Sequence, residues 1–259
     1  MRNMKKIYLL FPSLIFFIFL LLVWELIVDA FDINPLLIPA PSAIFGASIA
    51  HAAVLWPHIL QTLFETIAGL LLAILFGSIV AIFIRISSLF KITVYPLLIV
   101  SQTIPIIALA PLLLIWFGFT ILPKVIIVTL VCFFPITIAF ADGMEKINPQ
   151  FIKLLQSMGA TRFQVLTHAE IPGALPSFFS GLRIAAAYSV TGAIVGEYVG
   201  GYQGLGIYMQ NAAHSYATTL VFVVIVVSSL LSIILFGAIS LLEYLFLPWA
   251  RKEKTKLFL

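Results

Sequence analysis

The sequence predicts an all-α protein that crosses a membrane several times. Apolar residues make up 63% of the 259 residues and charged residues only 9%. The mean hydropathy of +1.19 is far above that of soluble domains. The apolar residues gather in runs of roughly 17 to 23, close to the ~20 that a helix needs to cross a hydrocarbon core. We therefore expect one polytopic membrane domain over residues 1–259.

Six transmembrane helices account best for the runs and for the placement of charge. The expected spans are about residues 8–28, 66–84, 94–116, 125–141, 177–199 and 220–242. Residues 177–199 are the least hydrophobic of these, but without them the basic tail 251–256 would lie outside, against the positive-inside rule. With them, Lys124 is the one Lys or Arg outside, and both termini are cytoplasmic.

The first run follows Arg2, Lys5 and Lys6 and is long enough to cross the bilayer. A cleaved signal peptide is the alternative, since residues 28–30 resemble a cleavage site. The run exceeds the roughly 7 to 15 apolar residues of such peptides, so we expect it to be retained.

The segment 29–61 contains no Lys or Arg and is therefore expected outside. Within it, Ser42 follows a Pro-Ala-Pro turn and is expected to cap a short helix that runs to Leu55. Glu65 then precedes span two, where a carboxylate is favourable at a helix start.

Span three carries Pro96, Pro105 and Pro111, which is unusual for one helix in a membrane. Each proline leaves a backbone carbonyl that protein or a wet cavity, rather than lipid, has to satisfy. This span is therefore expected to line a path.

Residues 144–176 form the one long amphipathic segment. Asn148 can cap a first short helix with Pro149 in its first turn, and Gly159 interrupts the run before Thr161 begins a second. Pro172 and Pro176 are expected to end the segment. An amphipathic helix-Gly-helix element of this kind is suited to binding a partner, and a generic interfacial helix is the alternative.

The segment also resembles a known motif. Gly159-Ala160-Thr161, followed by Ile171-Pro172 and Gly181-Leu182-Arg183, is similar to the EAA loop of the membrane subunits of binding-protein-dependent ABC importers. The Glu-Ala-Ala triplet of that family corresponds here to Lys153-Leu154-Leu155, a departure from the pattern. The Pro-Ala-Pro-Ser turn at 39–42 and the stretch Gln102–Pro105 resemble the branch that handles nitrate, taurine, sulfonates or a thiamine pyrimidine precursor.

The resemblance implies a permease subunit in the bacterial inner or plasma membrane. The partners that it implies are a second copy of the chain, a cytoplasmic ATP-binding subunit in two copies and an extracytoplasmic binding protein. It implies a coupling loop at 144–176 whose ATPase-coupling residues are Met158, Gly159, Ala160, Arg162, Phe163 and Pro172. The candidate pathway residues are Gln102, Thr103, Pro105, Glu197 and Gln203.

Two charges within span five require an explanation, because a charge at bilayer depth costs at least about 2.5 to 3.5 kcal/mol. Glu197 is either a pathway residue beside the Gly-rich stretch 200–206 or an interfacial anchor of the helix end. Arg183 is expected to extend its side chain to the cytoplasmic headgroups.

No catalytic, cofactor or metal site is indicated. The sequence lacks a G-x-x-x-x-G-K-[ST] motif, so ATP hydrolysis would belong to a separate subunit. The four His residues and the single Cys132 show no metal-ligand spacing. The alternatives to an importer subunit are a gradient-driven secondary transporter, which would need more midspan carboxylates, and an intramembrane enzyme, which would need clustered His, Asp or Cys. No cluster of Lys or Arg marks an anion site, which favours the uncharged pyrimidine slightly among the substrates.

Overall fold

The computed structural model describes residues 2–249, with side chains from Pro12 onward, and every regular element in that part of the chain is a helix. The longer elements are α1 (Arg2–Ala30), α3 (Ala52–Ile86), α4 (Ser88–Ser101), α5 (Ile106–Phe117), α6 (Leu122–Glu145), α9 (Ile171–Gly200) and α11 (Thr218–Phe246). The shorter ones are α2 (Pro41–Ala50), α7 (Pro149–Ser157), α8 (Arg162–Val165), the π-helical turn η1 (Leu166–Glu170) and α10 (Leu205–His214). The predicted all-α class is confirmed.

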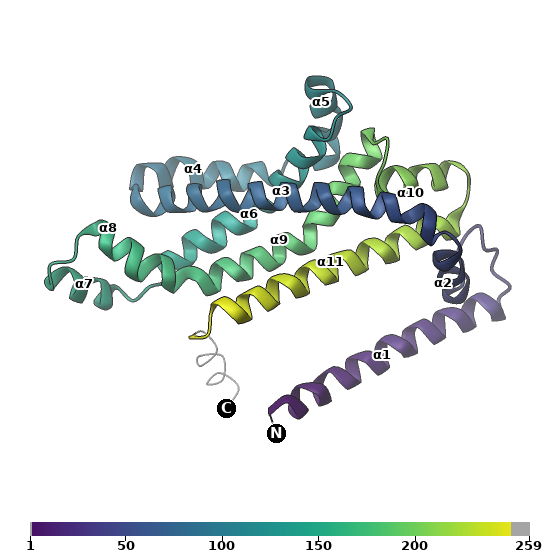
Figure 1. Ribbon diagram of the computed structural model, residues 1–259, viewed down its shortest axis with the longest axis horizontal. Helices are drawn as coiled ribbons and strands as arrows, with labels where there is room; N and C mark the ends of the chain where they lie inside the picture. Colours follow the sequence, from purple (N-terminus) through teal and green to yellow (C-terminus); the bar gives the residue numbers. More distant parts are fainter. Residues whose placement is uncertain (1, 250–259) are drawn as a thin grey trace.

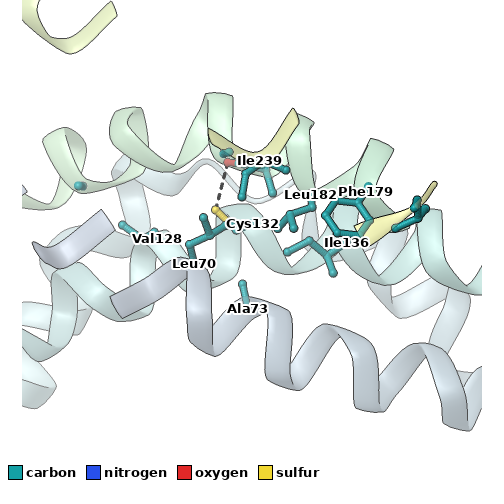
Figure 2. Close-up of a cluster of buried hydrophobic side chains, with 12 residues drawn as sticks. Leu70, Ala73, Val128, Cys132, Ile136, Phe179, Leu182 and Ile239 are labelled. Carbon is teal, nitrogen blue, oxygen red and sulfur yellow. Dashed lines mark hydrogen bonds between the residues drawn. The ribbon is translucent and has the colours of Figure 1, made fainter. Parts of the chain in front are cut away.

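Helices α3, α6, α9 and α11 run side by side and form the body of the molecule (Figure 1). Their shared core contains Leu70 from α3, Ile136 from α6, Leu182 from α9 and Ile239 from α11 (Figure 2). Cys132 lies in this core with its thiol 3.4 Å from the carbonyl oxygen of Ala185. It therefore acts as a small buried side chain that bridges α6 and α9.

Helix α9 approaches α6 closely because glycines line the face between them. A Cβ on Gly181 would meet the carbonyl oxygen of Pro135 and would come within 2.5 Å of Ala139 Cβ. Further along, Gly192 also faces α6, but less closely, since a Cβ there would lie 3.3 Å from Val131 Cγ2 and 3.4 Å from Val128 Cα. Membrane helices commonly pack through small residues. Lipid tails are as apolar as the side chains, so association depends on close van der Waals contact and not on the hydrophobic effect.

Within residues 2–249, five helices are long and apolar enough to cross a membrane, and the pair α4 and α5 would make a sixth. That pair shows that the third predicted span, 94–116, is not one continuous helix. The chain bends by 98° between Ser101 and Ile106, at the Gln102–Pro105 break. Pro105 has no N–H to continue the helical ladder, which accounts for the position of the break.

Helix α3 is also longer than the predicted span, with 35 residues that include Pro57 near its start. The short helix expected from Ser42 to Leu55 therefore ends earlier, at Ala50, and Leu55 already belongs to α3. Ser42 is not the cap, because α2 begins after Ala40. Its hydroxyl instead donates to Glu25 Oε1, and its N–H donates to Glu25 Oε2 at 3.0 Å. Ser42 therefore links α2 to α1.

Helix α1 stands apart from the body of the molecule and approaches it at the α2 end (Figure 1). There Trp24 packs against Phe222 of α11, with 5.8 Å between the ring centroids. The orientation of the termini remains a prediction, and the basic tail 251–256 on which it partly rests lies outside the described residues.

We expect Gly181→Ala to lower the free energy of unfolding by about 1 to 3 kcal/mol, because the added methyl group forces α9 away from α6. Thermal unfolding of the purified protein in detergent measures this change. Gly237→Ala is the matched control, since nothing lies within 4 Å of a Cβ there. Equal melting temperatures for the two variants would contradict the packing argument.

Candidate functional site

The amphipathic segment contains a short helix, a turn at Gly159 and the start of a second helix, as the sequence predicts, but this second helix continues into α9. The Asn148 side chain caps α7 by accepting from the Gln150 N–H at 2.9 Å. Gly159 has φ +89°, a left-handed conformation that favours glycine. Thr161 then caps α8 in a reciprocal capping box with Gln164.

This element exposes large apolar side chains at its tip. Met158 is 76% exposed and Phe163 is 72% exposed, and they flank the Gly159 turn. Phe151 and Leu154 on α7 are exposed as well, and α7 has no buried residue. Most of the apolar face of α7 is thus open, with only Ile152 and Leu155 half-buried.

The other side of the element is anchored to the helix bundle. Arg85 at the end of α3 makes two hydrogen bonds to the Glu170 carboxylate in η1, one of them 3.0 Å from Nε to Oε2. The Glu170 side chain is only 7% exposed. Val165 and Leu166 are buried beside it. The exposed tip is therefore joined to α3 and α9 by an ion pair and a small apolar contact.

Pro172 and Pro176 do not end the segment, contrary to the prediction. Pro172 lies in the first turn of α9, where proline is well tolerated, whereas Pro176 lies inside the helix, which continues past it to Gly200. The π-helical turn η1 leads directly into α9. Movement of the tip would consequently be transmitted along a continuous run of helix.

A cavity of about 440 Å³ lies beneath the tip. Its lining includes Arg85, Arg162, Phe163 and Glu170. Arg162 is exposed, and a neighbouring cavity of about 320 Å³ shares it and adds Lys91 and Glu145, which pair at 2.7 Å. The pairing of Arg85 with Glu170 was not predicted from the sequence. Their opposite charges at the ends of two apolar runs could have indicated it.

The candidate pathway residues fall in two places. Gln102, Thr103 and Pro105 are all exposed in the break between α4 and α5, where the helical backbone is interrupted. Gln203 is exposed in the Gly-rich stretch after α9. Glu197 differs from the other four because it is fully buried within this chain.

Glu197 holds the Gly-rich stretch in position. Its Oε1 accepts from the Thr62 hydroxyl at 2.7 Å, and its Oε2 accepts from the Gly206 N–H at 2.7 Å. Gly206 lies in the first turn of α10, where a carboxylate is favourable. A Cβ on Gly204, which has φ +129°, would collide with the Glu197 carboxylate.

His58 on α3 contacts both the Gly-rich stretch and α10. His58 Nδ1 lies 2.9 Å from the Gly204 carbonyl oxygen and 3.0 Å from its N–H, so the ring can use either tautomer. The Tyr208 ring packs on His58 with centroids 5.2 Å apart, and burial raises the pKa of the Tyr208 hydroxyl.

Three charged residues lie where the sequence analysis did not expect them. Glu65 is not a helix-start carboxylate, because α3 begins at Ala52 and carries Glu65 into the protein interior. There it lies 3.4 Å from the Lys124 ammonium, itself only 4% exposed. Arg183 does not reach for headgroups but pairs with Glu243 of α11. Helix-to-helix ion pairs avoid the cost of leaving such charges toward lipid.

The comparisons identify the family. Residues 73–245 match the family described as the inner membrane component of binding-protein-dependent transport systems. The chain belongs to this family. The permease is 38% identical to the formylaminopyrimidine transport permease protein of Halalkalibacterium halodurans, over 96% of its own length and 100% of the relative's. It is 32% identical to the riboflavin transport system permease protein of Chloroflexus aurantiacus (89% and 87%). It is 30% identical to the taurine transport system permease protein of Escherichia coli (89% and 86%).

The fold of the permease also has a solved counterpart. A chain of the MetNI methionine ABC transporter, in an inward-facing conformation, superposes with a TM-score of 0.60 over 74% of the permease and 97% of that chain. The identity is 18%, so the likeness concerns the fold alone. The permease is thus a multi-pass membrane subunit of an ABC importer, and its family implies partnership with an ATPase and a binding protein.

We expect Arg85→Met to loosen the tip, because Glu170 would be left buried without its cation. The free energy of unfolding should fall by about 2 kcal/mol, less than for a fully buried pair since Arg85 is itself 33% exposed. Amide hydrogen exchange over residues 162–170 should accelerate.

Lys91→Met is the matched control, because both partners of that pair are exposed and its loss should cost less than about 1 kcal/mol. Double substitution Arg85→Met with Glu170→Leu should restore part of the stability. An effect of Lys91→Met as large as that of Arg85→Met would refute the anchoring role of Arg85.

Proposed function

We propose that the permease acts as a homodimer that two cytoplasmic ATPase subunits drive through the tip around Gly159. The observation that carries this proposal is the combination of exposed Met158 and Phe163 with a rigid attachment to α3 and α9. Exposed apolar anchors are typical of binding surfaces, and a rigid attachment is needed to transmit movement.

The tip supplies the contacts expected of an interface. Met158 and Phe163 are the apolar anchors, and Arg162 at the edge of the cavity offers a cation to an acidic partner residue. Ala160 is small enough to let the Gly159 turn approach the partner closely. Pro172 fixes the start of α9 directly behind the η1 turn.

We propose further that the transported solute is an uncharged pyrimidine resembling the formylaminopyrimidine in the name of the 38% identical relative. No Lys, Arg, Asp or Glu occurs between Lys91 and Lys124, a range that includes the whole α4–α5 break. Gln102 and Thr103 in this break, and Gln203 in the Gly-rich stretch after α9, offer neutral hydrogen-bonding groups. Pro105 keeps the break open, and an anionic solute such as taurine would lack a cationic partner.

The binding protein is proposed to dock at the end formed by α2 and α10. This end lies opposite the tip (Figure 1) and carries Gln203 and the Glu197-anchored Gly-rich stretch. A substrate that the binding protein released at this end would enter the helix bundle beside α10. Glu197 would serve there as the residue that fixes the shape of the loop.

We expect Phe163→Ala and Met158→Ala each to weaken binding of the ATPase subunit about tenfold, as loss of an interface anchor does. Gly159→Pro should abolish binding, because proline cannot adopt φ +89°. Pull-down of the ATPase by the purified permease measures both. Phe45→Ala, which removes an equally exposed ring from α2, should leave binding unchanged. If no ATPase binds the wild-type permease, a gradient-driven carrier is the function to pursue.

In cells that express the whole transporter, uptake of radiolabelled formylaminopyrimidine should exceed that of taurine and nitrate by at least about tenfold. Gln102→Leu should lower this uptake about five- to tenfold, the cost of one lost hydrogen bond, without affecting ATPase binding. Ser228→Ala on α11 is the control, because its hydroxyl donates only within its own helix. Preferred uptake of taurine would overturn the substrate proposal and leave the ATPase coupling intact.

A further inference from the structure

Three buried charged residues meet where the middle of α3 packs against the start of α6 and the end of α9, and their charges have no role in the proposed transport. Glu65 and Glu197 are both 0% exposed, and Lys124 is 4% exposed. With all three ionised the group would carry a net charge of −1 in surroundings that exclude water. An uncompensated charge of this kind is expensive in a protein interior and more so within a membrane.

The hydrogen bonds around the two carboxyl groups are unequal. Glu197 accepts from Thr62 and from the Gly206 N–H, which satisfies one site on each oxygen. Glu65 Oε1 accepts from the Gln61 amide at 2.8 Å and faces the Lys124 ammonium. Glu65 Oε2 is buried and has no hydrogen-bond partner. One carboxyl oxygen of the group is therefore left unsatisfied.

Glu65 follows Thr62 by three residues on α3, so their side chains share one face of that helix, and the Thr62 hydroxyl donates to Glu197. The two buried carboxyl groups are therefore close neighbours. When both are ionised neither can donate, so their closeness is purely repulsive. One added proton removes the repulsion, supplies the missing donor and brings the total charge of the group to zero. Two carboxyl groups that share one site commonly retain one proton for this reason.

We propose that Glu65 and Glu197 form a proton-binding site that holds one shared proton, with Lys124 as the balancing cation. The site fastens α3 and α9 to the Gly-rich stretch through Thr62 and Gly206. The other titratable groups near it are His58 on α3 and Tyr208 on α10, which reach it through Gly204. Helix α5 contributes none, and Glu243 on α11 pairs with Arg183, about 21 Å along α9 from Glu197.

Infrared spectroscopy of the full-length protein in lipid vesicles at neutral pH tests the proposal without reference to the transported solute. A protonated carboxyl group gives a C=O stretching band, separate from the carboxylate bands, that shifts on exchange into deuterium oxide. We expect this band in the wild type. It should disappear both in Glu65→Gln and in Glu197→Gln, because either variant leaves one carboxylate balanced by Lys124.

Lys124→Met provides the opposite test. Without the cation both carboxyl groups must be protonated for neutrality, so the band should gain about twofold in intensity. Glu145→Gln, at an exposed pair with Lys91, is the control and should leave the band unchanged. Absence of the band from the wild type, or its persistence in both glutamine variants, would overturn the proposal. Because the wild-type spectrum alone can decide against it, the test does not depend on every variant folding.

Discussion

The close contact of α9 with α6 and α3 is the constraint on which the rest of the structure depends. Membrane helices gain little from burying apolar surface against each other, so their association needs backbones that approach closely. Gly69 on α3 and Gly181 and Gly192 on α9 provide that approach, all three facing α6. An added Cβ at Gly69 or Gly181 would lie within about 2.5 Å of α6 atoms, so a larger side chain at either position would push the helices apart.

Both functional ends are fixed by this contact. At one end, α9 continues without a gap into η1, and Arg85 on α3 holds Glu170 there. At the other end, the same two helices supply Thr62 and Glu197, which hold the Gly-rich stretch before α10. A shift of α9 relative to α3 would therefore move both the exposed tip around Gly159 and the loop that carries Gln203. Under the proposed docking of an ATPase at the tip, this arrangement would provide a mechanical route to the opposite end of the molecule.

Charges inside the bundle serve the same purpose as the glycines. Arg183 with Glu243 joins α9 to α11, and Lys124 with Glu65 joins α6 to α3. Each pair links helices that are distant in the sequence. In an apolar medium a broken pair leaves a charge without water, so these pairs favour one particular arrangement of the helices. The shared proton proposed at Glu65 and Glu197 would complete that pattern at the remaining unbalanced charge.

The all-α membrane class, the amphipathic segment and its local geometry at Asn148, Gly159 and Thr161 could be predicted from the sequence. Those features follow from composition, run length and capping chemistry, which act over a few neighbouring residues. The partners of Glu65, Lys124 and Arg183, the 98° bend at Gln102–Pro105 and the continuation of α9 past Pro172 could not, because they depend on how the helices pack. A charge in an apolar run signals that some partner exists, but which helix supplies it depends on packing between segments far apart in the chain. Prolines likewise mark where a helix can break, whereas the surrounding helices determine whether it does.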